Sequence, residues 1–452
     1  SSMSNAVVSA FKNKQLRKKL LFTTLILIVV RFGSQLPIPE IDSAQISAYL
    51  KSTLGDSFNL LNSFTGGSFM QMSVFALSVT PYITSSIIMQ LMTIVIPALE
   101  EMQKDGEDGR KRMAKITRYV TVVLAIIEGA GLAIGFANQG ALGTDYTTFT
   151  IVTMIIALTA GAVLVMWLGE RITESGIGNG ISIILLVNIV SGMPGDFTSL
   201  YNQFMKGKQI GPALIAGCVI VGVVLAVVVF VIVLSDAERH IPVQYSKKMQ
   251  GRKLVGGQQS NIPLKVNTAG VIPIIFASSI MQFPIMLQNV LKYENNGFIG
   301  KALTSLNSST WFDASHPKRS IGLLIYIVLV ILFAYFYTSI TFNPLEISNN
   351  MKKQGGFIPG IRPGKPTVDY LTKILNYIIF IGACGLIIVQ VIPYFFNGVF
   401  GANVSFGGTS LIIIVGVVLE TIKKIESQML VRNYTGFLNN KGSNMKNSYL
   451  GY

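Results

Sequence analysis

The sequence predicts an all-α polytopic membrane protein with about ten transmembrane helices, which divide into two inverted halves of five. Three observations predict this fold class: an apolar composition, long apolar runs that recur along the chain, and loops that alternate in charge. Half of the 452 residues are apolar and only 13% are charged, a balance too apolar for a soluble chain of this length. The lipid bilayer is therefore the expected solvent.

The apolar runs begin at Leu20 and recur almost to the C-terminus. A membrane span needs roughly 20 mostly apolar residues, because unpaired backbone groups are not tolerated in hydrocarbon. The ten runs lie at about 20–36, 73–96, 116–137, 149–169, 179–193, 211–234, 267–290, 320–341, 370–393 and 408–426. They leave no room for a large soluble domain.

The first run has features of a signal peptide, because basic residues between positions 12 and 19 precede the apolar stretch 20–30. No small-x-small cleavage site follows, and the run continues through Arg31 into the sequence LPIPE. We therefore expect a first span that is retained.

Alternate loops differ in their content of Lys and Arg. One set carries Lys104, Arg110, Lys111, Arg112, Arg239, Lys247, Lys248, Arg252, Lys253, Lys265, Lys352, Lys353, Arg362 and Lys365. In the other set, the loops 138–148 and 394–407 contain no Lys or Arg. Because basic loops stay on the cytoplasmic side, both termini and the basic loops are expected to be cytoplasmic.

Ten spans with both ends inside divide into two halves of five around a loop near 194–210. An odd number of spans in each half forces opposite orientations, and inverted repeats of this kind enclose a site near the midplane. No residue-level repeat is visible, so the symmetry follows from counting alone. The expected parts are a basic N-terminus (1–19), a first half (20–193), an external loop (194–210), a second half (211–427) with cytoplasmic loops 235–265 and 342–367, and a cytoplasmic tail (428–452).

The segment FNLLNSFTGG at 58–67 is amphipathic, too short to cross the membrane, and ends in a pair of glycines. Irregular backbone at membrane depth survives only when it is buried in protein or faces water, so a short helix folded back into a central cavity is one interpretation. An interfacial helix on the membrane surface is the other. These residues alone leave both open.

Few charged residues lie well inside the predicted spans; Arg31 lies in the first and Glu128 in the third, while Glu170 and Glu420 lie near span ends. An ion-coupled transporter needs ionisable groups at its substrate site, because a proton or Na⁺ must have a ligand there. Only Glu128 lies deep enough in its span to serve in this way. A secondary transporter of a small solute and a structural assembly subunit nevertheless remain alternative functions.

Glu128 has polar residues at a similar depth, since Thr84 and either Ser278 or Ser279 lie at comparable distances from their span ends. Hydrogen bonds between these side chains across helices are worth only about 1 kcal/mol in lipid, so they would form a latch that can open. The alternative is a protonated carboxyl that only packs.

Apolar residues are paired one helical turn apart at Val79 and Ile83, and again at Ile181 and Leu185. Most pairs of this kind belong to a core. A narrow apolar ring can instead gate a pore by dewetting. Spacing alone does not select these four residues.

Several other classes of function are excluded by composition. The net charge of +15 is spread over short segments between apolar runs, which argues against direct DNA binding. Cys218 and Cys384 lie inside apolar runs, so neither a disulfide framework nor redox chemistry is expected. His240 and His316 lie in different loops without a Cys or carboxylate cluster, and we expect neither a metal site nor a cofactor.

Five long motifs carry a resemblance to a known family. They are VTPYITSSII at 79–88, MWLGERITESGIGNGISI at 166–183, IPLKVNTAGVIPIIFASSI at 262–280, GFIPGIRPGKPT at 356–367 and FGGTSLIIIVGV at 406–417. These motifs are long, occur in the same order as in the bacterial SecY family, and give a close resemblance to that family over nearly the whole chain. The resemblance is weaker at 291–319 and after Asn439. The ending IESQMLVRNYTGFL resembles that of Gram-positive members.

The resemblance implies a channel in the bacterial cytoplasmic membrane, with two five-helix halves hinged near 194–210 around a central pore. Such a channel lets secreted chains through and releases membrane segments sideways into lipid, and it is not an enzyme. The implied partners are the small subunits SecE and SecG, the motor SecA, the ribosome, secretory preproteins with their signal sequences, and membrane lipids.

The resemblance also assigns residues to the pore. An apolar ring at the waist falls on Val79, Ile83, Ile181, Leu185, Ile275 and Ile413. Family members often have Ile where this chain has Val79 and Leu185, which puts the diameter of the ring in doubt. The family's plug corresponds to about 57–71, including Asn62, Phe64, Thr65, Gly66 and Gly67, and this favours the re-entrant interpretation.

Two further sets follow from the resemblance. The lateral gate, between spans 2 and 3 on one side and 7 and 8 on the other, would contain Thr84, Glu128, Ser278 and Ser279, and other members carry Gln where this chain has Glu128. Docking of the motor or the ribosome is implied for Arg239, Lys247, Lys248, Arg252, Lys253 and Arg362. Exposed basic loops attract acidic protein or RNA surfaces, which agrees with this assignment, although orientation in the membrane alone explains many single Lys residues.

Overall fold

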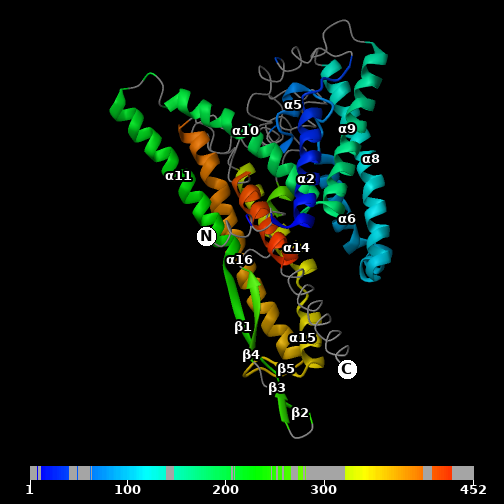
Figure 1. Cartoon of the computed structure of the whole chain (residues 1–452), viewed down its shortest axis with the longest axis vertical. Coiled ribbons are helices and arrows are strands. Elements are labelled where there is room, and N and C mark those ends of the chain that lie inside the picture. Colours follow the sequence, from blue (N-terminus) through cyan, green and yellow to red (C-terminus); the bar gives the residue numbers. More distant parts are fainter. Residues whose placement is uncertain are drawn as a thin grey trace, which may run out of the picture. The chain divides into compact units, whose positions relative to one another are not determined.

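The computed structural model describes residues 8, 12–39, 48, 62, 64–138, 147–204, 207, 209–245, 247–250, 253–256, 259–265, 273–277, 280, 321–400 and 410–429 (Figure 1). The chain divides into two compact units. The first contains Ser1–Gly55, Leu61–Met193 and Ile413–Tyr452, and the second contains Asp56–Leu60 and Pro194–Ile412. The division therefore falls between Met193 and Pro194, inside a helix and at the start of the loop expected at 194–210.

The described part of the first unit is helical. Its elements are α2 (Lys14–Gly33), α5 (Ser68–Gln71), α6 (Thr80–Val95), α7 (Pro97–Lys104), α8 (Gly106–Asn138), α9 (Thr148–Ser175), α10 (Gly180–Phe204) as far as Met193, and the last helix, 410–429, from Ile413.

Local sequence explains where several of these helices begin and end. Pro81 lies in the first turn of α6, where its missing N–H costs no hydrogen bond. Pro97 begins α7 and forces Ile96 into an extended conformation, which ends α6. Thr147 and Thr150 form a reciprocal capping box at the start of α9.

The helix α9 organises the first unit, because it packs against α2, α6 and α8 (Figure 1). Its buried residues Met154, Leu158, Val165 and Ile172 recur at helical spacing and form one face. On its other side, large apolar residues such as Trp167 are exposed. A helix that is apolar on both its packed and its exposed face is suited to lipid.

The second unit combines apolar helices with two small sheets. Its elements are the remainder of α10, α11 (Ile210–Asp236), β1 (Glu238–Tyr245), β2 (Lys247–Gln250), β3 (Lys253–Gly256), β4 (Gln259–Lys265), α14 (Ile321–Thr341), α15 (Pro344–Lys353), β5 (Gly356–Phe357) and α16 (Lys365–Phe400). One antiparallel sheet has the order β4-β1-β5, and β2 pairs with β3 in a second.

The loops predicted at 235–265 and 342–367 fold together within this unit. In β1, Ile241 and Val243 alternate with exposed residues and point into a small core. That core also contains Leu264 of β4, Met351 of α15 and Leu371 of α16. The prediction of an all-α chain is therefore wrong for these loops, where period-two burial produces strands.

The described residues contain six helices that are long and apolar enough to span a membrane. These lie at Gly106–Ala137, Thr148–Ser175, Gly180–Gln203, Ile210–Leu234, Leu324–Lys353 and Lys365–Val389, and a shorter apolar helix covers Thr80–Val95. The chain is accordingly a multi-pass membrane protein. Helices also cover most of the first and last predicted spans, whereas most of the span predicted at 267–290 lies outside the described residues.

Candidate functional site

The segment predicted as a plug is described at residues 62 and 64–71, and these residues belong to the first unit. Residues 62 and 64 are helical, residues 65–67 form a turn that leads into α5, and the residues after α5 pair with the segment that follows α2. Ser73 forms an isolated antiparallel bridge with Pro37, and the Val74 N–H donates to the Leu36 carbonyl at 3.0 Å. The side chains of Phe64 and Phe69 are buried within the unit.

Local hydrogen bonds shape the tip of this segment. The Thr65 hydroxyl donates to the Asn62 carbonyl at 3.1 Å and accepts from the Phe69 N–H at 3.2 Å. Gly66 and Gly67 both have positive φ, at 68° and 84°, a conformation that favours glycine. The predicted plug residues thus form a tight turn.

Two side chains from distant helices donate to backbone carbonyls of this turn. The Arg31 guanidinium of α2 donates to the Gly66 carbonyl at 3.0 Å. The Asn188 amide of α10 donates to the Phe64 carbonyl at 3.1 Å and to the Ser78 hydroxyl oxygen at 3.4 Å. Sequence reasoning assigned no role to Asn188, although a polar side chain within an apolar span is a signal of a special site.

Five of the six predicted ring residues belong to the first unit. Val79 precedes α6 and is buried, and Ile83 follows one turn later with its N–H on the Val79 carbonyl at 3.0 Å. On α10, Leu185 is buried and Ile181 is half-buried, with its side chain over Gly169 of α9. Ile413 is buried in the last helix.

The sixth ring residue, Ile275, belongs to the second unit and lies in the short helical stretch 273–277. It is buried there, next to Phe276, whose ring packs edge-on against Phe333 of α14 with centroids 5.7 Å apart.

The predicted lateral-gate residues are placed only in part. The Thr84 hydroxyl donates to the Thr80 carbonyl of its own helix at 3.0 Å. Glu128 lies half-buried on α8, and within the described chain its carboxyl has no hydrogen-bond or ion-pair partner. Ser278 and Ser279 lie outside the described residues, so a bond across the gate stays a prediction.

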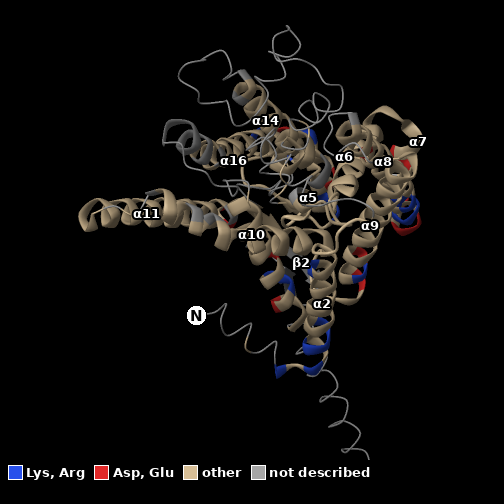
Figure 2. Ribbon diagram, turned by 90° about the horizontal axis from the view of Figure 1, so that it is seen from above, with Lys and Arg blue, Asp and Glu red and all other residues tan. Residues whose placement is uncertain are grey.

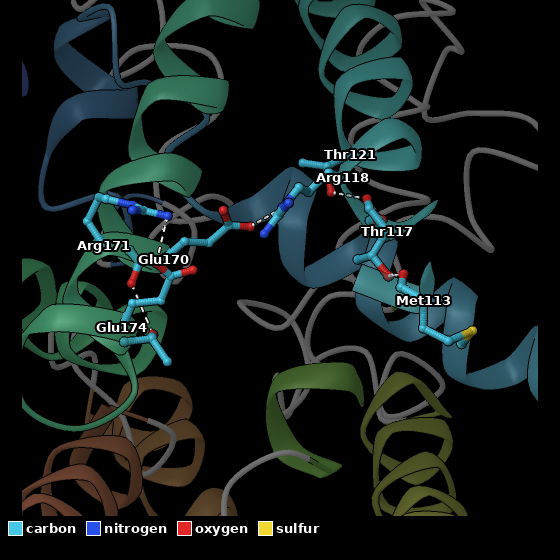
Figure 3. A network of polar contacts seen from close by, with 10 residues as sticks. Met113, Thr117, Arg118, Thr121, Glu170, Arg171 and Glu174 are labelled. Atoms are coloured by element: carbon cyan, nitrogen blue, oxygen red, sulfur yellow. Dashed lines mark hydrogen bonds and ion pairs between the residues drawn. The ribbon is translucent and has the colours of Figure 1, made fainter. Parts of the chain in front are cut away.

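A polar network missed by sequence reasoning joins α6, α8 and α9. The Arg118 Nε donates to a Glu170 carboxylate oxygen at 2.7 Å, which links α8 to α9 (Figure 3). The Ser85 hydroxyl of α6 donates to the Thr117 carbonyl of α8 at 2.8 Å. Because Arg118 is nearly half-exposed, its ion pair contributes only about 0–1 kcal/mol in water.

The predicted docking residues lie on the sheets and on the turn after β5. Arg239 is exposed in β1, Lys247 and Lys248 belong to β2, Lys253 begins β3, and Arg252 lies outside the described residues. Other basic residues gather at the start of α2 and beside α7 and α8 (Figure 2).

Arg362 is exposed at the tip of a constrained turn. Gly360 and Gly364, on either side of it, have φ of 81° and 99°. The Thr367 hydroxyl donates to the Arg362 carbonyl at 2.7 Å, and the Ser348 hydroxyl donates to the Gly364 carbonyl at 3.3 Å. The turn therefore presents the guanidinium from a fixed backbone.

In the described part of the chain, no group of three or more His, Cys, Asp or Glu residues could hold a metal ion. The candidate residues described are a plug-like turn and buried apolar residues in the first unit, and exposed basic loops in the second.

Comparisons with known proteins agree with this picture. The SecY family model matches residues 73–422. The protein translocase subunit SecY of Streptomyces coelicolor is 43% identical over 455 residues, covering 96% of this chain and all of that relative. This similarity over nearly the full length makes a chance match untenable.

Solved structures share the fold. A SecY structure described for its plug domain has a TM-score of 0.63 at 18% identity, covering 91% of this chain and 92% of the other. Sec61 in the canine ribosome-channel complex has a TM-score of 0.61 at 17% identity, with the same coverage of both chains. With the family model matched over most of its length and a relative 43% identical, this chain belongs to the SecY family.

Proposed function

We propose that this chain is the pore-forming subunit of a protein-conducting channel, which translocates unfolded secretory polypeptides across the bacterial cytoplasmic membrane. The observation that carries the proposal is the 43% identity to a protein translocase subunit over all of that relative's length. The same channel would release transmembrane segments into lipid through a lateral gate, and it is not an enzyme. A secondary transporter is not supported, because a translocase subunit matches 96% of this chain.

The proposed architecture is ten spans in two inverted halves around a pore, with a hinge at 194–210 and both termini cytoplasmic. The division of the chain between Met193 and Pro194 supports the position of the hinge. A Pro inside a helix removes a hydrogen bond and weakens the helix at that point.

The proposed resting seal combines the apolar ring and the plug at 57–71. Buried apolar side chains at the waist would exclude water and ions by dewetting while yielding to a larger chain. A structural neighbour supports the plug assignment, because its plug domain stabilises the closed state of its translocation channel and maintains a membrane seal.

The proposed partners are SecE and SecG in the membrane, and SecA or a ribosome at the cytoplasmic loops. The ribosome is supported by the canine Sec61 neighbour, which forms a ribosome-channel complex. Secretory preproteins with their signal sequences and membrane lipids complete the set. Lipid contact is supported by the many exposed apolar residues of α11.

Reconstitution of the chain with its small subunits and a motor ATPase tests the proposal. Proteoliposomes should protect an added secretory protein from external protease in an ATP-dependent manner. Uptake of a small solute without such protection would instead identify a transporter. If neither activity occurs in vesicles where the chain is folded and correctly oriented, a structural role would replace the channel.

Replacement of Arg362 with Ala should lower motor-driven translocation on the order of tenfold, because an exposed guanidinium on a rigid turn is lost from the docking surface. Lys should restore only part of the activity, since it keeps the charge but not the planar fork. Exposed Lys353 of α15 offers a control, because Lys353→Ala removes the same charge from a nearby helix. Translocation rates in vesicles provide the measurement, and wild-type rates with Arg362→Ala would remove the docking role.

Glu128 is proposed to hold the lateral gate closed by donating a hydrogen bond from a neutral carboxyl. Glu128→Gln should preserve closure, whereas Glu128→Leu should shift the equilibrium between closed and open gates about fivefold, equivalent to about 1 kcal/mol. The export of marginal signal sequences measures this shift. Equal acceptance of such signals by all three channels would leave Glu128 as a packing residue.

A further inference from the structure

Two hydrogen-bond donors that are far apart in the sequence, Arg31 and Asn188, contact the same turn. Arg31 lies 35 residues before Gly66, and Asn188 lies 124 residues after Phe64, yet each donates to one of these two carbonyls. The neighbouring Asn62 and Thr65 carbonyls accept from backbone N–H groups, whereas the Phe64 and Gly66 carbonyls accept from these two side chains. The turn is therefore held by α2 and α10 through polar contacts.

Burial of Asn188 and the charge of Arg31 strengthen the hydrogen bonds that these donors make. Asn188 is only 1% exposed, and its bond to Phe64 is therefore shielded from competing water. Arg31 brings a positive charge to the Gly66 carbonyl, and charge-assisted hydrogen bonds are stronger than neutral ones. Within the described chain, Arg31 has no carboxylate at ion-pair distance, which leaves its guanidinium available to this carbonyl.

The side chains of Arg31 and Asn188 lie very close to Gly66. A Cβ atom placed on Gly66 would collide with Nη1 of Arg31 and would lie 2.9 Å from Oδ1 of Asn188. A Cβ atom placed on Gly67 would meet nothing within 4 Å. The two donor side chains thus enclose Gly66 specifically.

An unpaired acceptor on Asn188 lowers the free-energy cost of releasing the turn. Oδ1 of Asn188 is buried and has no hydrogen-bond partner in the described part of the chain. An unpaired buried acceptor is unfavourable, and movement of the turn away from α10 would admit water to it. Loss of the Phe64 bond on opening is therefore partly offset.

We propose that Arg31 and Asn188 are positioning residues that latch the plug turn at Phe64 and Gly66 in the resting channel. The strength of the hydrogen bonds that these two residues donate determines how readily the plug leaves its buried position. The inference rests on the proposed channel function, and it adds two residues that determine the ease of opening.

Ser68 supplies a reporter of plug position. Its side chain is fully buried and its hydroxyl has no hydrogen-bond partner among the described residues, so Ser68→Cys removes no hydrogen bond. Cys218 and Cys384 would be replaced with Ala to leave one thiol. Alkylation of that thiol by a membrane-impermeant maleimide then measures how often the plug leaves its buried position in channels purified with their small subunits.

The latch predicts about a threefold to tenfold faster alkylation in Asn188→Leu and in Arg31→Gln, which corresponds to the loss of about 0.6–1.4 kcal/mol, the size of one hydrogen bond to the turn. Arg31→Lys, which keeps a charged donor, should restore part of the protection. Ser191 is the matched control, because its hydroxyl donates to the Asn188 carbonyl within α10 and makes no hydrogen bond to the described residues of the turn. Ser191→Ala should leave the rate unchanged, and an equal increase there would show general loosening of α10 and overturn the latch.

Unchanged alkylation in both Asn188→Leu and Arg31→Gln would also overturn the latch. Addition of the motor, ATP and a secretory protein separates the latch from the channel function. Substrate-dependent alkylation in every variant supports the channel. Faster resting alkylation in the latch variants, without any response to substrate, would support the latch and overturn the proposed function.

Discussion

Replacing Ile83 and Ile275 together with Ser is expected to raise the resting ion conductance of the reconstituted channel on the order of tenfold or more. Both side chains are buried, and both belong to the proposed apolar ring. A ring of apolar side chains keeps a narrow passage dry, whereas hydroxyl groups hydrogen-bond to water and stabilise a wetted passage. Planar bilayer recordings without motor or substrate would measure this leak.

The neighbouring residues Ile87 and Ile274 provide a matched control. Both are buried to a similar degree, Ile87 lies one turn after Ile83, and Ile274 precedes Ile275. Their replacement with Ser removes the same apolar groups from the core and carries a comparable folding cost. A leak that is equal in both double variants would point to general destabilisation, and no leak in either would count against the ring assignment.

Hydropathy predicted the helices well where a long apolar run has no internal break. The run predicted at 211–234 is contained in α11, and the run at 116–137 is contained in α8. However, α8 begins at Gly106, ten residues before its apolar run. A helix can extend beyond the membrane into water wherever its residues favour the helical conformation. Hydropathy therefore does not mark where such a helix begins or ends.

The start of the second span was predicted at 73, seven residues before α6 begins at Thr80. Residues 73–79 are apolar enough for a span, but Ser78 has a φ of 48° and the Ser73 backbone bridges to Pro37. Hydropathy measures solvent preference and carries no information on backbone conformation. The strand β1 was missed for a different reason, because its period-two pattern lies within a loop that was interpreted through its charge alone.

The polar contacts of the plug turn could not be predicted from the sequence. Asn188 and Phe64 are 124 residues apart, and no local pattern specifies that one contacts the other. Family resemblance supplied the predicted positions of the plug and the ring, and these assignments stay predictions. It did not point to Asn188, because the acceptor of Asn188 in the plug turn is the Phe64 backbone carbonyl, which has no side-chain signature.

The second large effect is expected from Gly66→Ala, measured against Gly67→Ala. Both glycines have positive φ, so Ala is strained at either position by about 1–2 kcal/mol. Only at Gly66 does the added methyl group also collide with Arg31 and Asn188. The difference between the two variants therefore isolates the contact with the two donors.

The collision at Gly66 involves the far end of a flexible Arg side chain, so it can be relieved when the Arg31 guanidinium swings away. That movement gives up the hydrogen bond to the Gly66 carbonyl, and it loosens the turn without unfolding the unit. Gly66→Ala should therefore raise resting conductance on the order of tenfold more than Gly67→Ala does, given an overpacking cost of about 1–3 kcal/mol at Gly66 alone. Thermal unfolding of the two variants should differ much less than their conductance.

A double-mutant cycle decides whether the extra effect of Gly66→Ala acts through the two donors. In a channel that already carries Arg31→Gln and Asn188→Ala, the hydrogen bonds to the turn are absent and the space beside Gly66 is larger. Gly66→Ala and Gly67→Ala should then raise the conductance equally, because only the shared backbone strain is left. If Gly66→Ala keeps its larger effect in that background, the methyl group must disturb some other contact, and the close approach of Arg31 and Asn188 would have no part in closing the channel.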